Sequence, residues 1–185
     1  MELIDVLNTR RATRSLEKVK IDDKTVKTLA EAASLAPSCF NKQPWKFIFV
    51  RDDAKLKELF EILPTGNKWA HKASMIVAVL AKKEDDCILQ DREYYLFDTG
   101  FATNNIMLRA TDLGLISHPI AGYKKDEAME ILNIPSDFML ITLLIMGKKS
   151  SEFNEHLNEK QIEFETNRPP RKSFDEFAYL DSFKE

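Results

Sequence analysis

The residues most suited to chemistry form a basic cluster near the start of the chain, Arg10-Arg11-Ala12-Thr13-Arg14. If the helix predicted by the preceding apolar residues continues this far, the first and last arginines, four positions apart, project to the same side. Guanidinium groups suit phosphate and carboxylate, because their donors form a rigid planar fork and their charge does not titrate near neutral pH. The cluster is a candidate anion site. The alternative is a solvated basic helix end, which the helix dipole favours.

A second candidate is a loop held between two prolines, Pro37 and Pro44. Pro37 ends a helix that Asp22 or Asp23 can cap, and the strand 47–50 follows closely after Pro44. Between the prolines, serine and asparagine are residues that favour turns. A loop pinned at both ends is a rigid place for polar contacts.

Composition limits the classes of protein to which this chain can belong. Its 185 residues fit one domain, and 44% hydrophobic with 31% charged residues is ordinary for a globular protein. The net charge of −3 argues against nucleic acid as the main partner. The longest apolar stretch, Met139–Met146, is too short to cross a membrane, and the acidic start does not resemble a signal peptide. We expect a cytoplasmic protein that binds neither membranes nor nucleic acid.

The cysteines and histidines do not predict a metal site. Cys39 and Cys87 are too few for a disulfide framework, and His71, His118 and His156 lack the spacing of metal ligands. We expect Cys39 to be an inert small apolar residue, since the sequence places no histidine or lysine to activate it. We expect His118 to be a satisfied buried imidazole rather than a proton donor.

Apolar periodicity predicts alternating helices and strands. The continuous run 75–81 indicates a central strand covered on both sides, and 138–146 a second strand. A long helix is expected from about residue 91 to 113, and its interior Gly100 suggests close approach of another backbone. The inward positions predicted for this helix and its end are Tyr94, Phe97, Phe101, Leu108 and Leu115.

The C-terminal part has a different character. Residues 148–172 show no clean period, and an apolar tail follows them. Such a length without its own structure is unusual inside a domain, so we expect residues 1–147 to form the core and 148–185 an arm that wraps a second copy of the chain.

Taken in order, these segments resemble the FMN-dependent nitroreductase family. The basic cluster is similar to its R-R-S-x-R opening, and residues 36–47 to its A-P-S-x-x-N-x-Q-P-W-x-F loop. The long helix, followed by Pro119-Ile120-Ala121-Gly122-Tyr123, resembles the family's central helix and P-I-x-G-F turn. Residues 168–172 resemble its C-terminal basic motif. The resemblance extends from about residue 2 to 177, and the proline-bounded loop is its most specific part.

The resemblance implies an α+β fold, a three-layer sandwich with a mostly antiparallel central sheet flanked by helices, in an entwined homodimer. It implies an oxidoreductase that transfers hydride from NAD(P)H through N5 of FMN to a nitroaromatic, quinone or similar planar acceptor with ping-pong kinetics. One alternative is a flavin-binding, storage or redox-sensing module with little turnover. Another keeps catalysis but removes halogen from aromatic rings or passes electrons to oxygen.

The resemblance also implies roles for individual residues. Arg10, Arg11 and Arg171 would hold the FMN phosphate, and Arg14 would stabilise negative charge on reduced flavin. Ala12 replaces a serine common in the family, which puts flavin affinity in doubt. The other cofactor contacts implied are Pro37, Ser38, Cys39 and Asn41 from the partner subunit, Asn67 and Gln43 more weakly, and the turn Pro119, Ile120, Ala121 and Gly122.

Overall fold

The buried apolar run Met75–Ala81 forms strand β3 at the centre of the main sheet. It pairs with β2 (Trp45–Val50) on one side and with β7 (Met139–Lys149) on the other. Two shorter strands, β6 (Ile116–Ile120) and β1 (Leu16–Glu17), also pair with β7. All of these pairings are antiparallel, as expected from the resemblance.

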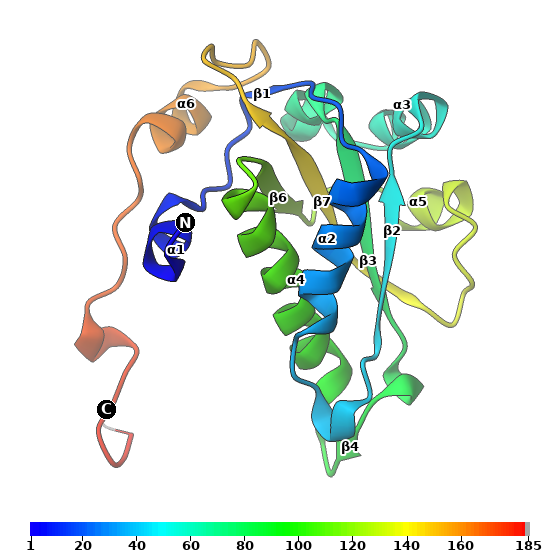
Figure 1. Cartoon of the computed structure of the whole chain (residues 1–185), viewed down its shortest axis with the longest axis vertical. Coiled ribbons are helices and arrows are strands. Elements are labelled where there is room, and N and C mark those ends of the chain that lie inside the picture. Colours follow the sequence, from blue (N-terminus) through cyan, green and yellow to red (C-terminus); the bar gives the residue numbers. More distant parts are fainter. Residues whose placement is uncertain (184–185) are drawn as a thin grey trace.

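Helices cover both faces of this sheet in the structure, a computed structural model that describes residues 1–183 (Figure 1). One face is covered by α2 (Asp23–Ser34) and α4 (Tyr94–Asp112). The opposite face is covered by α3 (Asp53–Glu61) and α5 (Lys125–Ile131). The predicted α+β three-layer sandwich is thereby confirmed.

Side chains of β3 alternate between the two faces, which explains why the run is apolar throughout. Met75, Val77 and Val79 pack in the cluster under α2 and α4, whereas Ile76 and Leu80 pack in the cluster under α3 and α5. Removing each such side chain from water contributes about 1.5–3 kcal/mol. A polar residue anywhere in β3 would therefore be costly.

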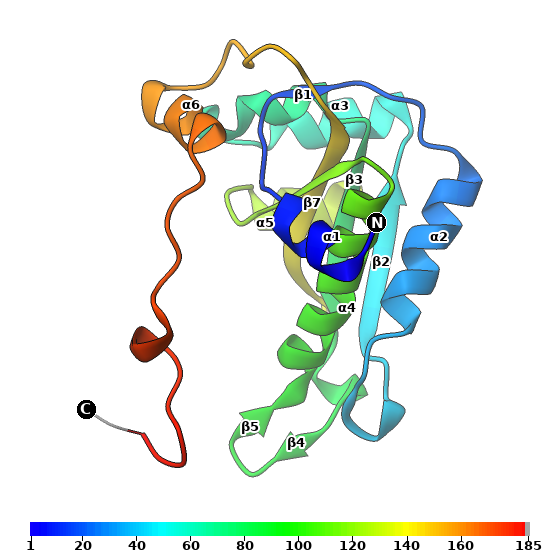
Figure 2. The same cartoon turned by 60° about the vertical axis from the view of Figure 1, so that its left-hand side comes forward.

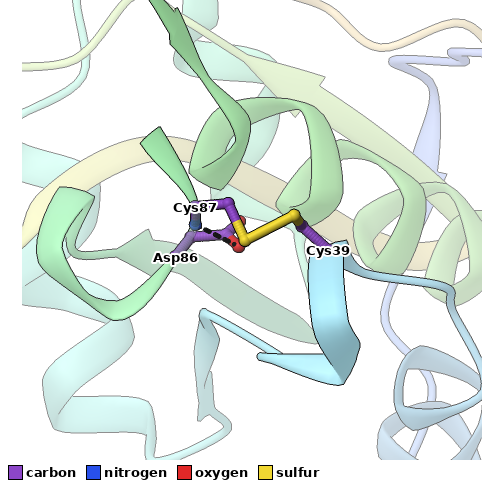
Figure 3. A group of neighbouring side chains, drawn as sticks. All are labelled: Cys39, Asp86 and Cys87. Carbon is purple, nitrogen blue, oxygen red and sulfur yellow. Dashed lines mark hydrogen bonds between the residues drawn. A yellow bond between two sulfur atoms is a disulfide. The ribbon is translucent and has the colours of Figure 1, made fainter. Parts of the chain in front are cut away.

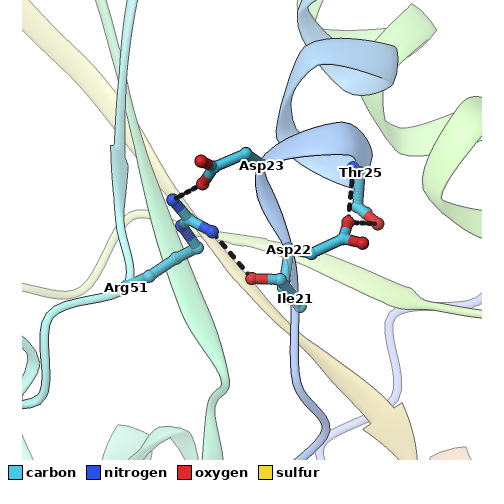
Figure 4. A network of polar contacts seen from close by, with 5 residues as sticks. All are labelled: Ile21, Asp22, Asp23, Thr25 and Arg51. Atoms are coloured by element: carbon cyan, nitrogen blue, oxygen red, sulfur yellow. Dashed lines mark hydrogen bonds and ion pairs between the residues drawn. The ribbon is translucent and has the colours of Figure 1, made fainter.

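The start of α2 is fixed by local polar contacts that Figure 4 shows. The Asp22 carboxylate accepts a hydrogen bond from the backbone N–H of Thr25 at 2.8 Å, so Asp22 is the N-cap. Arg51, just after β2, donates to the carbonyl oxygen of Ile21 at 2.8 Å and pairs with Asp23 at 2.5 Å. These contacts set where the chain enters α2 and, through it, the position of the following loop.

The predicted inward positions of α4 are wrong for Phe97 and Phe101, whereas Leu115, just beyond the helix, packs against the core as predicted. Its buried side chains are Tyr95, Asp98, Thr99, Ala102, Ile106, Ala110 and Thr111. Phe97 and Phe101 are exposed by 60% and 39% and stack edge to face on the opposite side of the helix. Gly100 lies on this exposed side, and a Cβ there would meet no atom within 4 Å. Ala102 and Ala110 are among the residues that face inward, where α2 and the sheet approach closely, whereas the rings of Phe97 and Phe101 face outward.

The C-terminal segment contains structure that the sequence pattern did not predict. Strand β7 continues to Lys149, and a helix, α6 (Glu159–Thr166), begins with a capping box between Asn158 and Gln161. Beyond residue 172 the chain is mostly exposed and runs away from the sheet (Figures 1 and 2).

The remaining elements are short. They are α1 (Leu3–Thr9), the hairpin β4 (Ile88–Leu89) and β5 (Arg92–Glu93), and the 3₁₀ helices η1 (Cys39–Asn41), η2 (Thr65–Lys72), η3 (Lys83–Asp85) and η4 (Phe174–Glu176). No helix in the described part of the chain has both the length and the apolar content to cross a bilayer.

Candidate functional site

The basic cluster lies outside a helix. Helix α1 ends at Thr9, and the chain then runs in an extended path to β1. This segment forms one wall of a recess of about 220 Å³, whose other wall comes from α6 and the segment after it. The lining residues are Arg10, Arg11, Ala12, Arg14, Phe164, Arg168, Pro169 and Arg171. Residues more than 150 positions apart therefore form one basic recess.

Several hydrogen bonds hold the walls of this recess together, and one of them runs from the Arg11 guanidinium to the carbonyl oxygen of Phe164 on α6. The Glu165 carboxylate on α6 accepts hydrogen bonds from the backbone N–H groups of Arg14 and Ser15, the latter at 3.0 Å. The Arg168 guanidinium donates to the carbonyl oxygens of Asn8 at 2.7 Å and Arg10 at 3.3 Å. Arg168 therefore positions the backbone that carries the cluster.

The recess has the electrostatic character of an anion site. Burial and the nearby charges of Arg168 and Arg171 lower the pKa of Arg10. Burial also lowers the pKa of Arg14, although Glu165 opposes that effect. Among residues 1–183, no side chain accepts a hydrogen bond or ion pair from the guanidinium of Arg10, Arg14 or Arg171. Crowded cations with unused donors fit a phosphate group.

His118 connects this basic segment to β6. Its Nδ1 lies 3.2 Å from the carbonyl oxygen of Thr13, and since a carbonyl only accepts, Nδ1 carries the proton. The ring packs against Trp69 with centroids 4.7 Å apart and is 7% exposed. Burial lowers the pKa of His118 from 6.5 to about 4. The expectation of a satisfied buried imidazole is confirmed.

The turn after β6 is held by Asn67. The Asn67 side-chain amide donates to the carbonyl oxygen of Gly122 at 2.7 Å and its oxygen accepts from the Trp69 indole at 3.3 Å. A Cβ on Gly122 would lie 3.0 Å from that amide nitrogen, so glycine allows the close approach. Asn67 thus positions the turn, whose members Pro119, Ala121 and Gly122 are exposed while Ile120 is buried.

The proline-bounded loop is rigid and unusual in its backbone. Phe40, Asn41 and Gln43 have φ values of +47°, +56° and +50°, a region that costs energy for residues other than glycine. The Ser38 hydroxyl accepts a hydrogen bond from the backbone N–H of Gln43 at 3.0 Å. Phe40 is 86% exposed. Backbone strain of this kind often accompanies a functional site.

A disulfide anchors this loop, which corrects our expectation for Cys39. Cys39 is bonded to Cys87, with 6.2 Å between their Cα atoms, and is therefore not a free apolar residue (Figure 3). Its backbone N–H also donates to the buried Asp98 carboxylate at 2.6 Å. Burial and the neighbouring Asp98 raise the pKa of Asp86, beside Cys87. Spacing could not indicate the bond, because 48 positions separate the two cysteines.

The structure does not bring this loop to the basic recess within one chain. The loop contacts Asp98 in the N-terminal half of α4. Helix α1, which precedes the basic segment, packs on α4. The N-terminal ammonium of Met1, just before α1, pairs with Asp112 at the C-terminal end of α4 at 2.9 Å. Figures 1 and 2 show the two segments well apart along α4. The candidate residues therefore form two groups, one around residues 10–14 and one around residues 37–43.

Sequence reasoning missed several residues that build these groups. Glu165 holds α6 to the basic segment, and Asp98 holds the loop. The Asn158 to Gln161 capping pattern could have predicted α6. Nothing in the sequence singled out Asp98, which interrupts an apparent apolar stripe.

Comparison with known proteins agrees with this fold. The Nitroreductase family model matches residues 7–65 and 63–148. A protein of Archaeoglobus fulgidus, named "Putative NADH dehydrogenase/NAD(P)H nitroreductase", is 31% identical, covering 82% of this chain and 87% of the relative. A nitroreductase family protein from Clostridium novyi NT has a TM-score of 0.76 and 25% identity, over 99% of this chain and 95% of that one. An oxidoreductase described as containing FMN has a TM-score of 0.83 and 25% identity, over 97% and 91% of the two chains.

These matches define an α+β oxidoreductase fold of the nitroreductase type. The chain belongs to the nitroreductase family, and it is an enzyme of that family. The resemblance inferred from the sequence motifs is confirmed.

Proposed function

We propose that the protein is an FMN-dependent oxidoreductase that uses NAD(P)H to reduce a nitroaromatic, a quinone or a similar planar acceptor. The observation that carries the proposal is the basic recess, in which Arg10, Arg14 and Arg171 converge with unused guanidinium donors. The FMN phosphate is an anion suited to such donors. Relatives named as NAD(P)H nitroreductases and the similar FMN-containing oxidoreductase support the assignment.

The residues present fit FMN in its separate parts. Arg10, Arg11 and Arg171 would bind the phosphate. Arg14 follows Thr13, whose carbonyl oxygen is bonded to His118 on β6, so Arg14 would lie nearer that strand and face the flavin ring. The backbone of Pro119 to Gly122 would approach the ring edge. When bound, FMN would supply two-electron hydride chemistry at N5, first with NAD(P)H and then with the acceptor, which gives ping-pong kinetics.

The protein's own contribution would be electrostatic and positional. The Arg14 guanidinium would stabilise negative charge that develops on the cofactor during reduction, because it is half-buried and poorly screened. Ala12 offers only its backbone to the cofactor, so affinity would depend more heavily on the arginines. Among residues 1–183, no acidic side chain lines the recess, and solvent would supply the protons.

The complete site would require a homodimer. The loop with Ser38 and Asn41 is far from the basic recess of its own chain, so a second copy would have to bring its loop to that recess. Exposed apolar side chains offer an interface: Leu3 and Ile4 on α1 are 67% and 62% exposed, and α1 packs on α4, whose Phe97 and Phe101 are also exposed. Figure 2 shows α1 in front of α4.

The test begins with the cofactor. Purified protein should be yellow and should release FMN, identified by mass, when denatured. Stopped-flow mixing with NADH and with NADPH should bleach the flavin rapidly, and a quinone or nitroaromatic should restore its colour. A flavin that stays oxidised for minutes with both nucleotides would instead support the flavin-binding or redox-sensing module. Protein that binds no FMN would refute both.

A further inference from the structure

The disulfide holds the loop that the proposed dimer would bring to the FMN site, but its sulfur atoms and the carboxylate beside them take no part in the proposed hydride transfer. The Sγ atoms of Cys39 and Cys87 and a carboxylate oxygen of Asp86 lie within 4.8 Å of one another. Both cysteines are partly exposed, so reductants and ions can reach them. Figure 3 shows the Asp86 carboxylate directed toward the sulfur atoms.

Asp86 has an unusual position for a carboxylate. Asp86 is 8% exposed, and its Oδ1 accepts a hydrogen bond from the backbone N–H of Cys87 at 2.7 Å. Oδ2 is buried, and within residues 1–183 no N–H or O–H group donates to it; the neighbouring polar group is the Asp98 carboxylate, and burial together with this carboxylate raises the pKa of Asp86. A buried carboxylate oxygen without a partner is costly, and a cation is one way to satisfy it.

We propose that the reduced form of this cluster binds one zinc ion through Cys39 Sγ, Cys87 Sγ and an Asp86 carboxylate oxygen. Two thiolates and one carboxylate are ligands that zinc accepts, at about 2.3 Å for sulfur and 2.0–2.2 Å for oxygen. In a tetrahedral site these lengths place the ligand atoms about 3.5–3.8 Å apart. All three ligand atoms already lie within 4.8 Å of one another, and after reduction the two sulfur atoms, bonded to each other in the oxidised form, must move apart to reach this spacing. Water would take the fourth position.

Neighbouring residues support this arrangement from outside. Asp98 holds the backbone N–H of Cys39 at 2.6 Å, which fixes one ligand to α4. The bond from Cys87 N to Asp86 Oδ1 orients the carboxylate so that its other oxygen is available. Loss of such a contact to a metal ligand typically weakens metal binding by about tenfold to hundredfold.

The chemical steps balance. A phosphine and one water reduce the disulfide, giving two thiols and the phosphine oxide. Zinc then displaces the two thiol protons and forms two metal–sulfur bonds. The oxidised form cannot bind in this way, since its sulfur atoms are bonded to each other. The loop at residues 37–43 would thus be anchored by a disulfide in one state and by a metal in the other. Our sequence expectation of no metal rested on the small number of cysteines and the spacing of the histidines, and it did not consider Asp86 beside Cys87.

The experiment uses the full chain, reduced with a water-soluble phosphine, desalted without oxygen and titrated with Co²⁺ as a spectroscopic substitute for zinc. We expect a thiolate-to-cobalt charge-transfer band and d–d bands at wavelengths longer than flavin absorption, saturating at one equivalent and abolished by Zn²⁺. Oxidised protein should give neither. Asp86→Asn should weaken binding by about tenfold or more. The control Asp85→Asn, which changes the exposed neighbouring carboxylate, should bind as the unaltered protein does.

A second measurement avoids any dependence on a variant's folding. In the reduced unaltered protein, one equivalent of Zn²⁺ should protect both cysteines from alkylation, as read by mass spectrometry, and an equal amount of Mg²⁺ should not. Absence of thiolate–cobalt bands in reduced protein, or unprotected cysteines with zinc, would overturn the proposal. Equal affinity in a folded Asp86→Asn variant and in Asp85→Asn would remove Asp86 from the site.

Discussion

The carboxylate of Glu165 on α6 accepts a 3.0 Å hydrogen bond from the backbone N–H of Ser15, 150 positions earlier in the chain. The same oxygen also accepts from the N–H of Arg14. One carboxylate therefore satisfies two adjacent backbone donors and fixes the distance between the two walls of the basic recess. This contact connects a C-terminal helix, which buries no side chain fully, to the segment that carries the arginines.

Replacing Glu165 with alanine should destabilise the protein by about 1–3 kcal/mol, because two partly buried N–H groups lose their acceptor. Denaturant unfolding measures this, and limited proteolysis should show faster cleavage within residues 150–172. Glu163→Ala, an exposed glutamate on the same helix, is the control and should change neither. Equal effects of the two substitutions would show that Glu165 does not anchor α6.

Arg10→Ala should weaken FMN binding by roughly 1.5–3 kcal/mol, the usual loss for a charge-assisted hydrogen bond to phosphate. Fluorescence titration of apoprotein with FMN and with riboflavin separates the phosphate contribution from that of the ring. Riboflavin affinity should hardly change. Arg92→Ala, which removes an exposed arginine outside the recess, should bind FMN normally. If both ligands lose equally, Arg10 does not contact the phosphate.

Removing residues 173–185 should weaken the proposed homodimer. In the described part of this segment, Phe174, Phe177 and Leu180 are 57%, 64% and 69% exposed, and such apolar surface favours burial against a partner. Sedimentation velocity over a range of concentrations should show dissociation at higher concentration than in the full chain. The far-ultraviolet circular dichroism should stay the same. A shortened protein that dimerises as tightly as the full chain contradicts this role for the tail.

The sequence predicted the parts of the fold that depend on burial on both sides. The run 75–81 indicated a covered strand, Pro37 marked the end of α2, and Asp22 or Asp23 marked its start, which the structure places at Asp22. Periodicity failed for α4, because it cannot distinguish an apolar stripe that faces the sheet from one that faces outward. It also failed for the Cys39–Cys87 bond, which depends on where the fold brings two loops together.

His118 should make stability depend on pH. Its pKa is about 4 in the folded protein and near 6.5 when unfolded, so between these values the unfolded state binds more protons. Stability therefore falls as pH decreases through this window, by about 2 kcal/mol between pH 7.5 and pH 5. Urea unfolding of His118→Phe, compared with unaltered protein at both pH values, isolates this contribution.

The phenylalanine variant keeps an aromatic ring beside Trp69 but has nothing to protonate. It should lose stability at pH 7.5 through the missing bond to Thr13, yet change less than the unaltered protein on moving to pH 5. His156→Asn, which replaces an exposed histidine, should retain the full pH dependence. If the Phe variant shows the same decrease as the unaltered protein, other groups carry the effect.

Arg14→Gln tests the electronic part of the proposed function. Glutamine keeps some length and hydrogen bonding but removes the positive charge, so reduced flavin, which carries negative charge, should lose more stabilisation than oxidised flavin. The midpoint potential should fall by a few tens of millivolts, since about 1.4 kcal/mol corresponds to roughly 30 mV for a two-electron couple. Spectroelectrochemical titration measures this shift, and stopped-flow reduction by NAD(P)H should be slower.

Arg14 and Arg10 line the same recess. Because Arg10 is proposed to bind the phosphate and Arg14 to face the flavin ring, the two substitutions should have different effects. Arg10→Ala should loosen FMN with the potential of the remaining bound flavin nearly unchanged, whereas Arg14→Gln should lower the potential with FMN still bound. Burial makes the Arg14 charge effective, because water screens a half-buried guanidinium less than an exposed one. If Arg14→Gln only loosens the cofactor and leaves its potential unchanged, Arg14 is a binding residue and has no electronic role.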